Sequence, residues 1–288
     1  MRRKIMPLPT PNLHPPFNIV RQSHVELGVT DLAKSRAFYV DTLGLQVTDE
    51  SADAIYLRAL EERGHHCIVL RKTDKAEARD LGFKLYSEDD LDRAEHFFKG
   101  KGLPVEWVER PYQSRTLRTR DPHGIPLEFY SRMDRLPPIH QKYALYKGVK
   151  PLRIDHFNCF SPNVDESVAF YNELGFRVTE YTEDAETGRL WAAWTHRKAA
   201  FTISPSPMAR GRACTIPLSG CRHRSTSSTC STSCPPPAGL PISSAVPAAT
   251  AFSMPSSSMC ATRMAIASKS TARITRRSIP IWSRSSGI

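Results

Sequence analysis

Two polar side chains at positions 156 and 158 are the clearest candidates for chemistry in this sequence. His156 and Asn158 follow Arg153, Ile154 and Asp155 in a segment whose apolar and polar residues alternate. Because side chains of a strand alternate between its faces, His156 and Asn158 project from the same face. An imidazole can ligate a metal or transfer a proton. A single strand histidine is more often structural, so the elements around His156 decide what it means.

An internal repeat places His156 at the start of a structural unit. His24 and His156 each begin a predicted strand, and each is followed fifteen residues later by a tyrosine, Tyr39 or Tyr171. In both copies a helical pattern lies between the two residues. Each helix ends at a Leu-Gly pair whose glycine suits the left-handed conformation of a helix C-terminus. Strands follow at residues 54–60 and 66–71 in the first copy and at 190–195 in the second. The repeat predicts β-α-β-β-β units.

A divergent unit of the same kind lies between the two copies. Its predicted strand covers residues 82–87, and its predicted helix covers 88–101, with Leu91, Ala94 and Phe98 on one face. Strands around 115–120 and 125–130 complete it. We therefore divide the chain as follows: an extension at 1–19, a pair of β-α-β-β-β modules at 20–135, a connector at 136–151, the first module of an incomplete second domain at 152–198, and a tail at 199–288.

The composition of the chain changes abruptly near Lys198. All 29 acidic residues lie at or before Glu186, whereas the tail from Ala199 contains ten of the 40 Lys and Arg residues. About +10 of the net charge of +11 thus belongs to the tail, which lacks helical or strand periodicity. We expect this tail to be disordered, because it has too few patterned large apolar residues to offset the entropy of ordering.

Composition also limits the classes of function. No run approaches the ~20 apolar residues that span a bilayer, and the basic start, with Met1 or Met6 as alternative initiators, has no apolar core of a signal peptide. We expect a cytoplasmic protein without membrane partners. The basic tail and Cys221, His223, Cys230 and Cys234 suggest nucleic-acid or zinc binding. We disfavour both, because these residues lie in the aberrant tail.

Residues 17–198 resemble the homoprotocatechuate 2,3-dioxygenases, a family of extradiol ring-cleaving dioxygenases in the vicinal-oxygen-chelate superfamily. The segment Leu152 to Asn158, the segment Trp191 to Lys198, and the residues Val29 to Ser35 with Phe38 to Asp41 carry the resemblance. It implies an α+β fold of tandem βαβββ modules, of which the first pair is non-catalytic and the second is incomplete here. It also implies a homotetramer for the intact family.

The resemblance implies a mononuclear metal on two His and one Glu, with Fe(II) expected, Mn(II) as the alternative, and dioxygen as co-substrate. His156 matches the first ligand, Asn158 a residue beside the substrate and oxygen, and Trp194 an aromatic residue of the pocket. Core packing explains Trp194 almost equally well. The implied reaction is extradiol cleavage of a small catechol, 3,4-dihydroxyphenylacetate.

The first pair of modules contains a partial copy of this ligand set. His24 corresponds to His156, and Glu128 lies in a strand like the one that carries the family's ligand Glu. The middle position falls near Phe83 and Lys84, where there is no His. We therefore expect His24 and Glu128 to be structural, and we expect His65, His66 and His123 to be surface or turn residues.

The family's remaining ligand segments are missing after Lys198, yet they are recoverable in a reading frame displaced by one base. With suitable synonymous codons, residues 213–216 conceal Leu-His-His, and residues 262–271 conceal Pro-Asp-Gly-His-Arg-Ile-Glu-Ile-Tyr. Loss of one G at the Lys198/Ala199 junction would produce this pattern. We hypothesise a frameshift, genomic or from sequencing. We predict that the literal chain, that is, the 288 residues as translated, has little or no activity.

Two other functions fit the modules that precede Lys198. One is a binding module without redox chemistry, and the other is a metal-dependent isomerase or lyase of the glyoxalase kind. Only ring cleavage would convert 3,4-dihydroxyphenylacetate to a yellow semialdehyde, which separates the three functions.

Overall fold

The computed structural model describes residues 8–184 and 186–197. Beyond them it describes only the backbone of four strands: β13 (Thr202–Pro207), β14 (Cys214–Thr215), β15 (Leu218–Ser219) and β16 (Ile274–Ser278). Most of the predicted tail at 199–288 lies outside the described residues. The prediction that this tail is disordered therefore concerns residues that the structure does not describe. Within the described residues, no helix is long and apolar enough to cross a membrane.

The first module follows the predicted β-α-β-β-β order. Its elements are β1 (Ile19–Val29), α1 (Leu32–Arg36) continued by the π-helical turn η1 (Ala37–Thr42), β2 (Gln46–Glu50), β3 (Ala54–Arg58) and β4 (Ile68–Lys72). The Asp31 side chain caps α1 by accepting a hydrogen bond from the Lys34 amide at 2.9 Å. Gly44 has a φ of 85°, which confirms the predicted left-handed residue after the helix.

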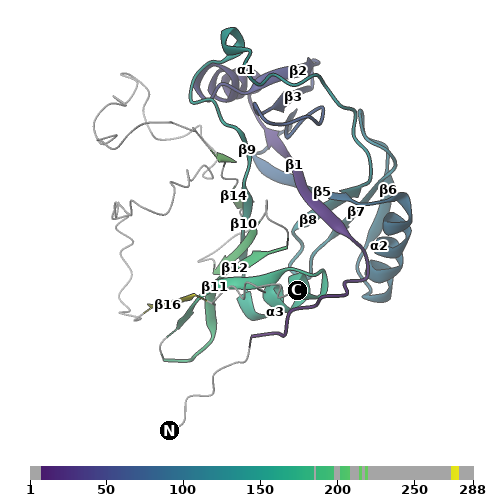
Figure 1. Cartoon of the computed structure of the whole chain (residues 1–288), viewed down its shortest axis with the longest axis vertical. Coiled ribbons are helices and arrows are strands. Elements are labelled where there is room, and N and C mark those ends of the chain that lie inside the picture. The colour runs from purple at the N-terminus through teal and green to yellow at the C-terminus, as the bar shows by residue number, and fades with distance from the viewer. Residues whose placement is uncertain are drawn as a thin grey trace, which may run out of the picture.

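The second module repeats this order and joins the first in one sheet. It consists of β5 (Glu77–Leu85), α2 (Glu88–Gly100), β6 (Val105–Val108), β7 (Thr116–Arg120) and β8 (Pro126–Tyr130). The eight strands lie in the order β2-β3-β4-β1-β5-β8-β7-β6, with β1 antiparallel to β5 at the centre. The two modules are therefore related by a pseudo-twofold axis between β1 and β5 (Figure 1).

The third module has the same strand order as the first. It comprises β10 (His156–Ser161), α3 (Val164–Glu173), β11 (Arg177–Asp184), β12 (Leu190–His196) and β13. Its order β10-β13-β12-β11 corresponds to β1-β4-β3-β2, and β14 and β16 extend the sheet at its two edges. Gly175, after α3, has a φ of 86°, the counterpart of Gly44. The predicted α+β fold of tandem βαβββ modules is confirmed.

The segment between the two parts is held against the first module. It contains the short helix η2 (Tyr143–Leu145) and leads into β9 (Arg153–Ile154), which pairs with β15. A Cβ on Gly44 would lie 1.8 Å from the Lys147 carbonyl oxygen, and a Cβ on Gly148 would lie 2.1 Å from that of Thr42. Only glycine permits this crossing of two backbones. The crossing fixes the path by which the chain reaches β10.

One continuous core joins the third module to the first pair. Phe83 of β5 is 1% exposed, and its ring lies 5.7 Å from Phe157 of β10 and 6.3 Å from Phe176. Phe98 of α2 lies 6.5 Å from Phe170 of α3. These contacts bury the face of β10 that carries Phe157 against the first pair. The opposite face of β10, which carries His156 and Asn158, is left for a site.

Arg197 links the end of β12 to the start of β1. Its guanidinium donates to the carbonyl oxygens of Ile19 at 2.8 Å and Leu174 at 2.7 Å, and to the Asn18 Oδ1 atom at 3.1 Å. It also occupies the space where a Cβ on Gly175 would lie, 1.9 Å from Nη1. The sequence does not predict this role of Arg197, because none of these acceptors is near it in sequence.

Replacing Arg197 by alanine should lower the free energy of unfolding by about 2–3 kcal/mol, because half-buried carbonyl groups would lose a charged donor. Denaturation in urea measures the change. Arg189→Ala is the matched control, since the Arg189 side chain is 60% exposed and its ion pair with Asp165 is at the surface. Equal effects of the two substitutions would contradict the role of Arg197.

Candidate functional site

The sequence-predicted residues lie on the face of the third module that points away from the core. Phe157, Cys159 and Ser161 of β10 are buried, and His156 and Asn158 alternate with them on the other face. On β12, Ala193 packs with α3, so Trp194 also lies on the outer face with respect to α3. His156, Asn158 and Trp194 therefore share one face of a four-stranded segment, with β13 between β10 and β12.

His156 is oriented by the residue before it. The His156 Nδ1 atom lies 3.0 Å from the Asp155 Oδ2 atom, and the imidazole is 18% exposed. The hydrogen bond to His156 holds the pKa of Asp155 below its usual value, against the opposing effect of burial. A carboxylate on one imidazole nitrogen fixes the tautomer and leaves the other nitrogen, Nε2, with a free lone pair. The geometry suits a ligand or a base.

The Asn158 amide is ready to bind an external group. Its Oδ1 atom is buried and has no hydrogen-bond partner within the described residues. A buried carbonyl oxygen without a partner costs free energy, so such an atom usually marks a place where water or a ligand binds. The position of Asn158 beside a substrate stays a prediction.

The sheet register brings one further histidine to this face. His156 pairs with Thr202 of β13, and Thr202 pairs with His196 of β12. His196 therefore lies in the same row as His156, two strands away, and burial together with Arg177 lowers the pKa of His196. Trp194 is half-buried in the neighbouring row, opposite Glu180. His196, unlike Trp194, was not predicted as a site residue, although alternation along the strand places both on one face.

The described residues do not fit a three-ligand metal. No group of three or more His, Cys, Asp or Glu side chains in the described part of the chain could hold a metal ion. His156 is thus a single candidate ligand. The short strand β14 lies antiparallel to β10, with Asn158 paired to Thr215. This is the position that β5 takes beside β1.

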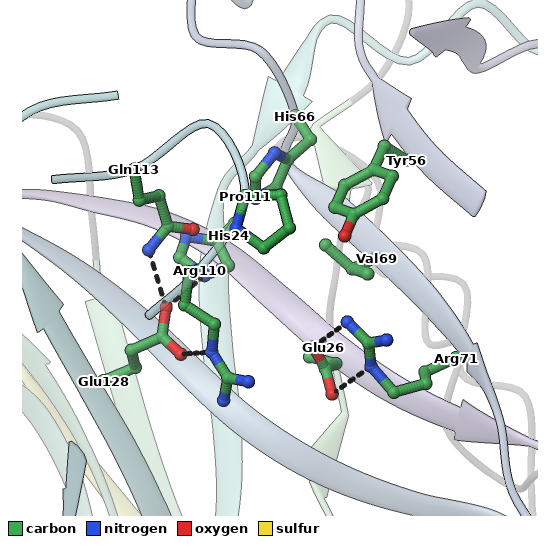
Figure 2. Close-up of a pocket in the computed structure, with 10 residues that line it drawn as sticks. All are labelled: His24, Glu26, Tyr56, His66, Val69, Arg71, Arg110, Pro111, Gln113 and Glu128. Atoms are coloured by element: carbon green, nitrogen blue, oxygen red, sulfur yellow. Dashed lines mark hydrogen bonds and ion pairs between the residues drawn. The ribbon is translucent and has the colours of Figure 1, made fainter. Parts of the chain in front are cut away.

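A second polar cluster lies in the first pair of modules, around His24, the counterpart of His156 (Figure 2). The sheet register aligns His24, Gly82 and Glu128 in one row across β1, β5 and β8. The middle position, predicted near Phe83 and Lys84, is therefore Gly82, one residue earlier. A Cβ there would lie 2.2 Å from the His24 ring, so the imidazole fills the space that a ligand side chain would need.

Glu128 is the centre of this cluster. It is 2% exposed and accepts hydrogen bonds from Gln113 at 2.9 Å and Arg110 at 2.8 Å, while His24 Nε2 lies 3.0 Å from Oε1 (Figure 2). Burial alone would raise the pKa of Glu128, but the hydrogen bond and charge of His24 and the charge of Arg110 lower it to about 2. Glu128 is therefore a structural anion, in agreement with the prediction for His24 and Glu128.

His65 and His66 lie in the loop before β4 but are buried, so the prediction that they are surface residues is wrong. They are 5% and 3% exposed, and burial lowers the pKa of both. The His65 ring stacks on Tyr112 with 3.6 Å between centroids, and His66 meets His24 edge-on at 5.1 Å. Strand periodicity could not show this burial, because it depends on Tyr112 from a distant loop. His123 lies in the turn between β7 and β8, as predicted.

Fold and site together define a chain built from βαβββ modules that carry polar residues on one face of each sheet. The glyoxalase/bleomycin resistance protein/dioxygenase superfamily matches residues 21–129 and 153–207, more than half of the chain, and the chain belongs to this superfamily.

Its relatives within the superfamily are extradiol dioxygenases. The homoprotocatechuate 2,3-dioxygenase of Arthrobacter globiformis aligns with a TM-score of 0.67 and 35% identity, covering 75% of this chain and 67% of that one. That of Brevibacterium fuscum, in complex with 3,4-dihydroxyphenylacetate, gives 0.66 and 35%, covering 74% and 67%.

A manganese-dependent 2,3-dihydroxybiphenyl 1,2-dioxygenase of Geobacillus genomosp. 3 is 29% identical over 175 residues, which are 57% of this chain and 56% of that protein. A metapyrocatechase of Geobacillus stearothermophilus is 27% identical over 196 residues, or 62% and 58%. The chain thus spans little more than half the length of these curated relatives.

Proposed function

We propose that this chain derives from an extradiol ring-cleaving dioxygenase that opens 3,4-dihydroxyphenylacetate with dioxygen. The observation that carries the proposal is the shared face of His156, Asn158 and Trp194, in a chain that aligns with a homoprotocatechuate 2,3-dioxygenase at 35% identity. The Asn158 Oδ1 atom would accept a hydrogen bond from the bound catechol, Trp194 would pack against its ring, and Asp155 would hold His156 in position.

We further propose that the literal 288-residue chain is inactive. The resemblance calls for Fe(II), or Mn(II) as in one named relative, on two His and one Glu. The described residues supply His156 alone and do not fit such a metal. A shift of one base at the Lys198/Ala199 junction would account for the missing ligands, and the pairing of β14 with β10 supports a ligand segment beside β10 in the restored frame.

The remaining attributes of the lineage are proposals of the same kind. The catechol is its small-molecule partner, and nucleic acid and membranes are not. We place the protein in the cytoplasm and the intact form in a homotetramer, by resemblance to the dioxygenases.

Restoring the frame tests the function directly. Insertion of one base at the Lys198/Ala199 junction should yield a protein that turns 3,4-dihydroxyphenylacetate yellow in air, whereas the literal chain should give no colour. The frame-restored His156→Ala protein is the matched control and should also give none. A restored protein that binds the catechol without cleaving it would favour a binding module, and one that isomerises thiohemiacetals would favour the glyoxalase kind. Either result would contradict the proposal.

A further inference from the structure

The turn between β7 and β8 contacts α3 of the third module through a buried carboxylate. Asp121, at the start of this turn, is 2% exposed, and its Oδ2 atom accepts a hydrogen bond from the Tyr171 hydroxyl of α3 at 3.3 Å. Its Oδ1 atom accepts from the backbone N–H groups of His123 at 2.9 Å and Ile125 at 2.8 Å. The Asp121 carboxylate therefore fixes the turn and places the His123 side chain beside α3.

The His123 imidazole faces a carboxylate of α3 without a hydrogen bond between them. Its Nε2 atom lies 3.6 Å from the Glu166 Oε2 atom. The His123 side chain is 9% exposed, and the Nε2 atom is buried with no hydrogen-bond partner among the described residues. A buried polar atom without a partner costs free energy. Protonation gives the ring a positive charge and a hydrogen on both nitrogens, so the Glu166 carboxylate would then attract it.

The charged groups of the two segments favour the positive form of His123. Asp121 lies on the same turn and interacts with the His123 charge, and Glu166 approaches from α3. The arginines of this region are bound to other groups. The Arg120 guanidinium donates to a carbonyl oxygen of the turn at 2.9 Å, and Arg189 pairs at 3.3 Å with the α3 carboxylate that precedes Glu166. Two carboxylates, one from each segment, thus act on the imidazole.

We propose that His123 is a protonation-sensitive latch that holds α3 of the third module against the first pair more firmly at mildly acidic pH. An imidazole changes its charge between pH 5 and 8, whereas an exposed Glu stays ionised over most of this range. The positive ring has its partner only in the folded chain, so this stabilisation is present at low pH and is lost as the pH rises. The latch acts on the element that directly follows β10 and its His156. This inference does not depend on the proposed function.

Amide hydrogen exchange of α3 in the full chain, at pH 5.5 and pH 8, tests the latch once the rates are divided by their intrinsic values. The protection factors of α3 should be about two- to fivefold higher at pH 5.5, the range for a partly exposed ion pair. His123→Gln and Glu166→Gln should each abolish this difference. Glu173→Gln is the matched control, because the Glu173–Lys101 ion pair also joins α3 to the first pair. Lysine keeps its charge at both pH values, so the control should lower protection equally at both.

The variants separate His123 from the other group that can take up a proton here. Burial raises the pKa of Asp121, but an effect of Asp121 would persist in His123→Gln. A pH dependence of α3 protection that persists in this variant overturns the proposal, and so does equal protection of the parent at both pH values. If His123→Gln does not fold, Glu166→Gln decides alone, since the Glu166 side chain is 53% exposed. Loss of the pH dependence then supports the latch, and an unchanged pH dependence overturns it.

Discussion

Phe83→Ala should lower the free energy of unfolding by about 3–5 kcal/mol, the range for removing a fully buried aromatic side chain. The Phe83 ring contacts Phe129 of its own pair, at 5.6 Å, and Phe157 and Phe176 of the third module. Its loss would open a cavity where the two parts meet. Because the third module shares its core with the first pair, its protection should fall most. Urea denaturation and amide hydrogen exchange measure the two effects.

Tyr86→Ala is the control for Phe83, because Tyr86 follows the same strand and is 75% exposed. It should change stability by about 0.5 kcal/mol or less. Loss of protection confined to β5 and β8, with β10 and α3 unaffected, would contradict a core shared between the first pair and the third module.

Glu128→Gln should cost about 3 kcal/mol at neutral pH, and the cost should shrink as the pH falls. The pKa of Glu128 in the folded chain, about 2, is below the ordinary value of 4.5, so its ionised form stabilises the fold. That contribution is complete above pH 4.5 and is lost as the pH falls toward 2. The difference in unfolding free energy between parent and variant should therefore decrease by about 2 kcal/mol between pH 5 and pH 3.

Glu109→Gln, at an exposed position before Arg110, is the control for Glu128. Its difference from the parent should stay near zero and flat over the same pH range. A cost of Glu128→Gln that does not vary with pH would mean that Glu128 contributes through its shape alone, and would contradict a buried anion held by His24 and Arg110.

Local patterns in the sequence were enough to predict the modules. The fifteen-residue spacing from His24 to Tyr39 and from His156 to Tyr171 recurs because each module repeats the same strand and helix. Gly44 and Gly175 adopt the left-handed conformation that their place after a helix demands. Alternation along β10 likewise placed His156 and Asn158 on one face, as the structure confirms.

Features that depend on contacts between distant segments were not predictable in this way. The middle ligand position is Gly82 rather than Phe83 because the pairing of β1 with β5 contains register shifts, including one between Gln22 and His24. The burial of His65 depends on Tyr112, and the role of Arg197 depends on carbonyl groups of β1 and of Leu174, the residue after α3. Strand periodicity specifies a face, but it does not specify the partner that covers that face.

The first pair and the third module differ in the partners of the polar side chains around His24 and around His156. In the first pair, arginines from within the fold balance the carboxylates beside His24 and Glu128. In the third module, Asp155 pairs with His156, and the Asn158 Oδ1 atom has no hydrogen-bond partner among the described residues. A face of this second kind is suited to an external metal and substrate, provided that the missing ligands are supplied.

The metal content of the purified chains tests most directly whether the literal chain lacks a complete metal site. The literal and frame-restored proteins would be produced with iron and manganese in the medium and analysed by mass spectrometry of the elements. We expect about one metal ion per frame-restored chain, since two His and one Glu would then be present. We expect no stoichiometric metal in the literal chain. Stoichiometric iron or manganese in the literal chain that is lost on His156→Ala would contradict this expectation.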